Sequence, residues 1–376
     1  TISLAAGLAN DITLTNTSND FGTISVTSGN NVSLNDVSGF TLNAVTESQV
    51  AGDLTLETAG GVALALPAIT LGSGDNLTAT STGAVTDTGS LIVPGITTIS
   101  ASGQDVTFDD SSNNFGSIGV TGANVSILDA DAIELAASTV SGTFDIISGG
   151  AITNSGALVI TGASTFTNTA GTDAAITLAN AGNAFTGTVG FSTDSGSAVT
   201  VVDTTALDLQ ALTAASLSVT AGGDVTDSGT LAITGATTID AGTADITLTE
   251  AASTFGALAL TGANVSVVEN AAMELAASTI SGTASFDSTD NAITDSGTLA
   301  ITGATTIDAG TADITLTEAA STFGALALTG ANVSVVENAA MELAASTISG
   351  TASFDSTNNL ITDSGTLAIT GATTID

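Results

Sequence analysis

The chain contains no lysine, arginine, histidine, cysteine, tryptophan or tyrosine in 376 residues. Against these absences stand 37 Asp and Glu residues, which give a formal net charge of −37. A carboxylate without a partner cation is costly to bury, so we expect all of these side chains to face water. Nucleic acids and anionic membrane surfaces are bound through Lys and Arg, so we expect neither as a partner.

The missing residue types also remove most catalytic and metal-binding chemistry. Without His and Cys there is no Ser-His-Asp triad, imidazole ligand, thiol nucleophile, thiolate zinc site or disulfide. Without Lys there is no Schiff base and no Lys–Asn isopeptide bond. Hydrogen bonds and apolar burial must therefore hold the fold together. We predict that the chain is not an enzyme and has no catalytic residues, no cofactor and no specific metal site.

The residues that are present indicate a folded chain. Apolar residues make up 43% of the sequence, with 12 Phe as the aromatics and 2 Pro. A disordered acidic chain would be poor in Ile, Val and Leu. No apolar run approaches the roughly 18 to 20 residues of a membrane helix, so we expect no membrane insertion of this segment. Because the segment opens at Thr1 without a signal peptide, we expect any export signal to lie outside it.

Internal repetition is the most informative feature of the sequence. Residues 228–295 recur as residues 296–363 with two differences, Asp290 against Asn358 and Ala292 against Leu360. A marker Phe recurs along the chain at about one repeat length, at Phe21, Phe115, Phe185, Phe255 and Phe323, with an extra stretch between the first two. We predict one continuous solenoid over residues 1–376, a fragment of a longer array. Its predicted parts are diverged coils 1–87, repeats 88–154, 155–227, 228–295 and 296–363, and a partial repeat 364–376.

Apolar residues alternate with polar ones inside the repeat. The inward residues would include Leu231 and Ile233, Ile246 and Leu248, Val265 and Val267, Met273 and Leu275, and Ala284 and Phe286. A period of two indicates half-buried strands, here separated by short clusters of Gly, Asn, Asp, Ser and Thr. Roughly three strands per coil, about 22 residues per coil and roughly 17 coils predict an all-β fold, a parallel β-helix or β-solenoid.

Two other folds are compatible with parts of the pattern. The Ala-rich run at residues 269–278 has helical propensity, although a diverged copy at residues 131–135 keeps the strand alternation. A string of immunoglobulin-like sandwiches is the other all-β alternative, but the repeat is short for such a domain and no Pro-rich linkers separate the copies.

Several phrases resemble the repeats of filamentous-haemagglutinin-like proteins, which are very large bacterial surface proteins exported by two-partner or autotransporter routes. The phrases are Thr261-Gly-Ala-Asn-Val-Ser, Asp245-Ile-Thr-Leu-Thr, Ala277-Ser-Thr-Ile-Ser-Gly-Thr and Asp227-Ser-Gly-Thr-Leu. The resemblance is one of repeat style and carries no functional residue. It implies a right-handed β-helix, secreted or displayed at the cell surface, in adhesin, biofilm or filament roles.

We therefore expect a mechanical function, as an extracellular filament or adhesin stalk that assembles with itself end to end or laterally. An alternative is an adhesin module that binds a polysaccharide or a host receptor. Residues 44–83, which add turns to the regular repeat, are the best place for such a binding patch.

Carboxylates leave one enzymatic alternative, a β-helix polysaccharide-degrading enzyme. Its nearest candidate cluster is Asp105, Asp109 and Asp110. Solvated coil edges are the favoured interpretation, because no basic residue and no aromatic platform beyond Phe accompanies the acids. Loosely bound Ca²⁺ or Mg²⁺ is compatible with the carboxylates, although neither of the common calcium-binding repeat patterns is present.

Two further polar patterns have simple interpretations. Asn-x-Ser/Thr sequons begin at Asn31, Asn76, Asn124, Asn264 and Asn332. We interpret these Asn residues as turn residues that tolerate left-handed backbone and bond their own backbone, rather than as glycan acceptors. Thr-x-Thr pairs such as Thr247 and Thr249 are interpreted as outward strand residues, since an ice-binding array would need the pair on every coil.

Overall fold

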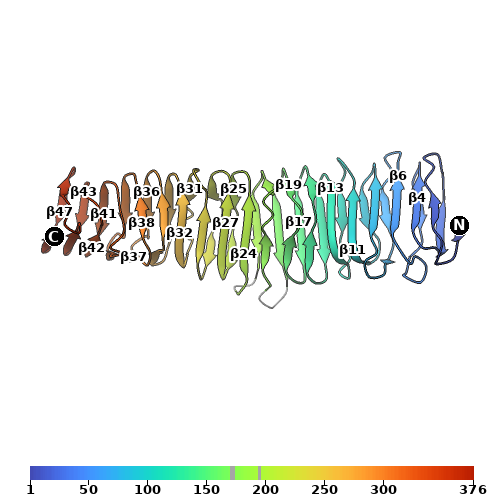
Figure 1. Ribbon diagram of the computed structural model, residues 1–376, viewed down its shortest axis with the longest axis horizontal. Coiled ribbons are helices and arrows are strands. Elements are labelled where there is room, and N and C mark those ends of the chain that lie inside the picture. Colours follow the sequence, from blue (N-terminus) through green and yellow to red (C-terminus); the bar gives the residue numbers. More distant parts are fainter. Residues whose placement is uncertain (170–173, 194–195) are drawn as a thin grey trace. The chain divides into compact units, whose positions relative to one another are not determined.

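The structure is a computed structural model that describes residues 1–169, 174–193 and 196–376 (Figure 1). These described residues form strands, turns and bends but no helix. They accordingly include no helix that could span a membrane. The chain divides into two compact units, unit 1 with residues 1–187 and 192–194, and unit 2 with residues 188–191 and 195–376.

The strands are short and follow one another at regular intervals along the chain. In the first half they are β1 (Ile2–Ala5), β2 (Ile12–Leu14), β3 (Thr23–Ser28), β4 (Val32–Asp36), β5 (Thr41–Leu42), β6 (Leu54–Thr58), β7 (Leu64–Leu66), β8 (Ile69–Thr70), β9 (Leu77–Ser81), β10 (Val85–Asp87), β11 (Leu91–Ser100), β12 (Val106–Phe108), β13 (Asn114–Gly122), β14 (Val125–Asp129), β15 (Ile133–Leu135), β16 (Ser138–Val140), β17 (Phe144–Ser148), β18 (Ile152–Asn154), β19 (Leu158–Ile160), β20 (Ser164–Asn168), β21 (Ile176–Leu178), β22 (Ala184–Phe185) and β23 (Val189–Ser192). In the second half they are β24 (Ala198–Asp203), β25 (Leu207–Leu209), β26 (Leu212–Ala214), β27 (Ser216–Ala221), β28 (Val225–Asp227), β29 (Leu231–Ile233), β30 (Thr237–Asp240), β31 (Ile246–Leu248), β32 (Ala257–Gly262), β33 (Val265–Val268), β34 (Met273–Leu275), β35 (Ser278–Ile280), β36 (Ala284–Asp287), β37 (Ile293–Asp295), β38 (Leu299–Ile301), β39 (Thr305–Asp308), β40 (Ile314–Leu316), β41 (Leu326–Gly330), β42 (Val333–Val336), β43 (Met341–Leu343), β44 (Ser346–Ile348), β45 (Ala352–Asp355), β46 (Ile361–Asp363), β47 (Leu367–Ile369) and β48 (Thr373–Ile375).

Each strand pairs in parallel with strands of the turns before and after it. In unit 2, β31 pairs with β33, β33 with β36 and β36 with β39, so that Ile246, Val265, Ala284 and Thr305 lie in one row. Paired strands are about 20 residues apart, and the two units together contain about 18 turns. The predicted all-β parallel β-helix is therefore confirmed, with turns slightly shorter than expected.

A turn has three sides. From Val265 the chain runs through β33, β34 and β35 before it returns to the first side as β36. The run at residues 269–278 thus contains strand β34 and no helix, so the helical alternative is wrong. The expected inward residues are buried, and the side chains of Leu248 and its copy Leu316 are 0% exposed. Their outward neighbour Thr247 is exposed.

The repeat is longer than a whole number of turns. Three turns lead from Ile246 to Thr305 on the same side. The copy of Ile246, Ile314, lies further along the chain on the next side, where it pairs with Ile293. Equivalent strands β31 and β40 therefore occupy different sides of the solenoid. A repeat therefore occupies three turns and one further side, slightly more than the three coils that we expected.

Candidate functional site

A row of Asp and Asn side chains, which we call the corner ladder, links successive turns at one corner of unit 2. The Oδ1 atom of Asp224 accepts the backbone N–H of Asp245 at 3.0 Å. The Oδ1 atom of Asp245 accepts both the backbone N–H and the side-chain amide of Asn264 at 2.9 Å. Asn264 Oδ1 in turn accepts the backbone N–H and the hydroxyl of Thr283 at 3.0 Å. Each side chain thus bonds the turn that follows its own.

The same ladder recurs in the near-identical repeat and in unit 1. Its members are Asp313, Asn332 and Thr351; Asp105, Asn124 and Thr143; and Asp11, Asn31, Asp53, Asn76 and Ile96. The five sequon Asn residues named above are therefore ladder members, whereas Asn16, which begins a sixth sequon, accepts the backbone N–H of Ser18 at 2.9 Å. Because all five side-chain amides donate to an Asp of the preceding turn, these groups are already engaged.

The expected left-handed backbone at these Asn residues is wrong. Among the described non-glycine residues, positive φ occurs at Thr289, Asp290, Thr357 and Asn358. The Asn side chains also bond the neighbouring turn rather than their own backbone. The physical reason is the stacked fold, which places the next turn's amide within reach of each corner side chain.

A second set of Asp residues caps strand ends. Asp227 accepts the backbone N–H of Thr249 at 2.8 Å through Oδ1 and that of Glu250 at 3.3 Å through Oδ2. Thr249 lies beyond the end of β31, whereas Thr247 is at the strand's centre. The Thr-x-Thr pair therefore does not form two parallel rows on one flat sheet.

The acids Asp105, Asp109 and Asp110 do not converge on a common site. Asp105 precedes β12 and belongs to the corner ladder, whereas Asp109 and Asp110 follow β12 and donate their backbone N–H groups to Asp87 at 3.1 Å. Four strand residues span roughly 13 Å, beyond the about 5 to 9.5 Å that separates glycosidase carboxyl pairs. Within the described ranges, no group of three or more His, Cys, Asp or Glu side chains is placed to hold a metal ion.

Some carboxylates are buried, which contradicts the expectation that all face water. The buried acids are Asp36, Asp129, Asp203, Glu269 and Glu337. Their burial has a recurring reason, since Asp129 accepts the backbone N–H of Phe115 at 2.8 Å and Glu337 accepts that of Phe323 at 2.9 Å. The sequence carried this signal, because an acid follows Phe115, Phe255 and Phe323 at the same spacing of 14 residues.

Burial makes these carboxyl groups hard to ionise. It raises the pKa of Asp129 to about 6, that of Glu337 to about 7 and that of Glu269 to about 8, against the opposing effect of the Phe amides. Glu269 faces the amide of Phe255, but neither of its carboxylate oxygens forms a hydrogen bond of ordinary geometry. Glu269 is therefore mostly protonated at pH 7, whereas Glu337 is about half protonated.

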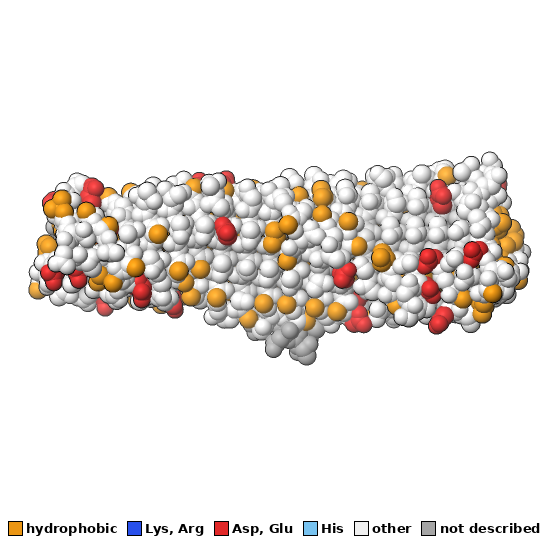
Figure 2. Space-filling view, viewed as in Figure 1, with side chains coloured by type: hydrophobic (Ala, Val, Ile, Leu, Met, Phe, Trp, Pro, Cys, Tyr) orange, Lys and Arg blue, Asp and Glu red, His pale blue; other side chains and the backbone are white. Residues whose placement is uncertain are grey.

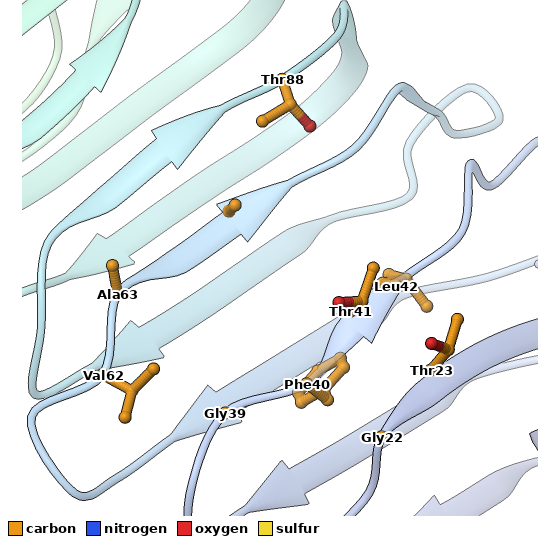
Figure 3. Close-up of a pocket in the computed structure, with 10 residues that line it drawn as sticks. Gly22, Thr23, Gly39, Phe40, Thr41, Leu42, Val62, Ala63 and Thr88 are labelled. Atoms are coloured by element: carbon orange, nitrogen blue, oxygen red, sulfur yellow. The ribbon is translucent and has the colours of Figure 1, made fainter. Parts of the chain in front are cut away.

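An opening of about 580 Å³ interrupts one side of unit 1, between β5 and β7 (Figure 3). Gly39, Phe40 and Val62 line it where the chain enters the two strands, and Leu42 and Ala65 line it along the strands themselves. Its volume is that of ordinary ligand pockets. One wall belongs to residues 44–83, the stretch in which we expected a binding patch.

The opening coincides with a break in the strand ladder. β5 pairs with β3, and β7 pairs with β10, but in the part of the chain that the structure describes no pairing joins β5 to β7. The turns touch again on both sides of the break. Before it, Ala59 N–H donates to the carbonyl of Asp36 at 3.0 Å, and after it Val45 N–H donates to that of Ala68 at 2.9 Å. The break is therefore local.

Apolar side chains are exposed beside the opening. Phe21 and Phe40 are half-buried, whereas the other Phe residues are buried. Val37 and Val62, at adjacent turns of the same corner, are 40% and 41% exposed. Phe40 lies against the opening, so this patch is a site where an aromatic ring is within reach of a ligand.

These features define a repeat protein of the β-solenoid class. The chain belongs to a family of repeats of unknown function (DUF5649), whose profile matches residues 51–121, 122–192, 196–261, 262–329 and 330–376. The matches that begin at residues 262 and 330 have the same spacing as the two near-identical repeats. No curated protein and no solved structure matches the chain.

Proposed function

We propose that this chain is a structural element of a secreted or surface-displayed protein, serving as a filament or adhesin stalk without catalysis. The corner ladder is the observation that carries the proposal. It joins turn to turn through side chains as well as backbone, and it uses neither a disulfide nor a metal ion. A chain reinforced in this way suits a spacer that must resist unfolding and proteolysis outside the cell.

The partners follow from the charge. A chain with 37 acids and no Lys or Arg has nothing with which to neutralise phosphates, so nucleic acid is not a partner. Self-association, end to end or lateral, is the proposed mode of assembly, with Ca²⁺ or Mg²⁺ bound loosely between carboxylates and no resident cofactor.

Electron microscopy of the purified chain tests this role. Long uniform fibres would support a filament, and separate rods of equal length would support a stalk. Rapid digestion by a broad-specificity protease at 37 °C would count against both, because a load-bearing extracellular element must stay folded.

A second candidate function is an adhesin module that binds a carbohydrate or a receptor, and the opening beside Phe40 favours it. Binding should then depend on the ring, so Phe40→Ala should abolish it. Ile147→Ala, which truncates an exposed apolar side chain on β17 away from the opening, is the control. The enzymatic alternative loses the cluster on which it rested, because Asp105 lies at the opposite end of β12 from Asp109 and Asp110.

A further inference from the structure

The two strands that flank the opening present unpaired backbone to each other. In a parallel ladder, the N–H and C=O groups of alternate residues point to opposite neighbours. Thr41 N–H donates to Gly22 and Asn43 N–H donates to Ile24, so the polar groups of the residue between them, Leu42, point away from β3. They point toward β7.

The facing strand has the complementary arrangement. Leu64 N–H donates to the carbonyl of Ala84, and the carbonyl of Leu66 accepts the N–H of Thr88 at 2.7 Å. These bonds turn Leu64 and Leu66 toward β10. The backbone of Ala65, between them, therefore points toward β5 and into the opening, where no strand of the described chain pairs with it.

We propose that the opening is an acceptor site for an extended peptide strand of another protein, apolar along one side and basic at its ends. Such a strand would complete the ladder by bonding Leu42 on one edge and Ala65 on the other. The inference goes beyond the structural role and does not depend on filament formation.

The length of the opening limits the strand. Neighbouring turns touch at Gly39, which is so close to Val62 that a Cβ atom at residue 39 would clash with the Val62 side chain. They touch again where the Val45 N–H donates to the carbonyl of Ala68. Six steps of strand separate Gly39 from Val45, or roughly 20 Å. A segment of about five residues fits this span. Its inward side chains would join the buried Leu42, Leu64 and Leu66, which accounts for the apolar side.

The charge of the site selects the ends of the strand. Asp20, whose carboxylate accepts the Ser38 hydroxyl at 2.8 Å, is exposed at the corner where the chain enters β5. Asp87 precedes Thr88 on the far wall, but its carboxylate accepts the backbone N–H groups of Asp109 and Asp110 in the next turn, so it adds negative charge near the opening without lining it. The chain offers no cation to balance these acids. A peptide with Lys or Arg at its ends is attracted, whereas a second copy of this acidic chain is repelled.

Fluorescence anisotropy with three synthetic peptides tests the proposal. The probe is a labelled Lys-Thr-Ile-Thr-Val-Thr-Lys peptide with blocked ends. The second peptide carries N-methyl groups on alternate residues, which remove the N–H donors along one edge of the strand. The third peptide has Glu in place of both Lys residues. We expect saturable binding of the probe, at least tenfold weaker binding of the methylated peptide, and no binding of the Glu peptide.

A variant locates the site. Ala65→Trp fills the opening from an exposed position and should weaken binding at least tenfold. Thr247→Trp places the same ring at an exposed position on β31. Because β31 is paired with β28 on one edge and with β33 on the other, this substitution should leave peptide binding unchanged. Circular dichroism confirms that each variant is folded. If Ala65→Trp does not fold, the comparison of the probe with its methylated form on the unaltered chain still decides.

Three results would overturn the proposal. They are equal affinity for the methylated peptide and the probe, equal effects of Ala65→Trp and Thr247→Trp, and absence of saturable probe binding at low salt. Binding of a neutral oligosaccharide that is blocked by Ala65→Trp, without peptide binding, would assign the opening to a carbohydrate instead.

Discussion

The two near-identical repeats differ at residues where the structure leaves room for change. Asp290 and its counterpart Asn358 both have φ of 69°, in the left-handed region that Asp and Asn tolerate better than other side chains. Ala292, which corresponds to Leu360, is half-buried and does not belong to the apolar core. Neither difference alters the apolar core or the corner ladder, so the two repeats differ at positions where packing restricts the side chain least.

The core column predicts a strong contrast between neighbouring residues of β31. Leu248→Asp would bury a charge that no cation in the chain can pair, and should destabilise unit 2 by about 3 to 5 kcal/mol. The exposed Thr247→Asp should change stability by less than about 1 kcal/mol. Thermal unfolding followed by circular dichroism measures both. Similar melting of the two variants would show that the register is not the one described.

The corner ladder predicts that Asn264 stabilises the fold through the hydrogen bonds of its side chain, whose oxygen accepts from Thr283 and whose amide donates to Asp245. Asn264→Val removes the acceptor for Thr283 and the donor to Asp245, and should lower the free energy of unfolding by about 1 to 2 kcal/mol. Thr247→Val, which also introduces a β-branched apolar residue at an exposed position, is the control. Denaturant titration of the two variants would contradict the ladder if their midpoints coincide.

At the scale of the strand and its turn, the buried acids make stability depend on pH. The pKa of Glu269 rises from its ordinary 4.5 to about 8, and that of Glu337 to about 7. The folded state therefore holds these protons more tightly than the unfolded state does. Their contribution to stability is fully present below about pH 4.5 and is lost as the pH rises through 7 and 8.

Glutamine substitutions isolate this dependence. Glu269→Gln with Glu337→Gln keeps both sites neutral, so the double variant should exceed the unaltered chain in stability by at least about 2 kcal/mol at pH 8.5, and the difference should become small near pH 5. Glu274→Gln, at an exposed position of β34, should behave like the unaltered chain at both pH values. Urea titrations at the two pH values would refute the assignment if the double variant showed no gain at pH 8.5.

The sequence predicted the strands well and the relations between turns poorly. Alternation alone identifies Leu231, Ile246 and Leu248 as inward residues, because side-chain direction within a strand is a local property. The partner of a corner side chain is about 20 residues away, and that distance depends on how each corner bends. For this reason, the bonds of Asn264, the burial of Glu269 and the break at Leu42 required the stacked structure.

The mismatch between repeat and turn affects the whole of unit 2. Because β31 and its copy β40 lie on different sides, a residue type that recurs once per repeat does not form a stripe along one face. Acidic positions are thereby distributed around the solenoid. On the face in Figure 2, the acidic side chains are scattered among uncharged polar and apolar ones and no basic side chain is present.

This charge distribution predicts that association between molecules requires divalent cations. The 37 acids over about 18 turns amount to about two per turn. With turns about 4.8 Å apart, this is roughly one charge per 2.4 Å along the stack, against one per about 1.7 Å in duplex DNA, where counterions condense. Partial protonation of Glu269 and Glu337 at neutral pH lowers this charge density only slightly. Bare molecules should repel each other over about 10 Å in 0.1 M salt.

Millimolar Ca²⁺ or Mg²⁺ should bridge carboxylates of adjacent molecules and raise light scattering, since no Lys or Arg can form such contacts. A chelator should reverse this increase by restoring repulsion. Acid should act in the opposite direction from the chelator, because protonation near the isoelectric point of about 4.1 removes the repulsion and promotes aggregation. NaCl at matched ionic strength is the control, because it screens charge without bridging. If scattering is the same with Ca²⁺, with chelator and with matched NaCl, divalent cations have no part in assembly, and association must rest on apolar or end-to-end contacts.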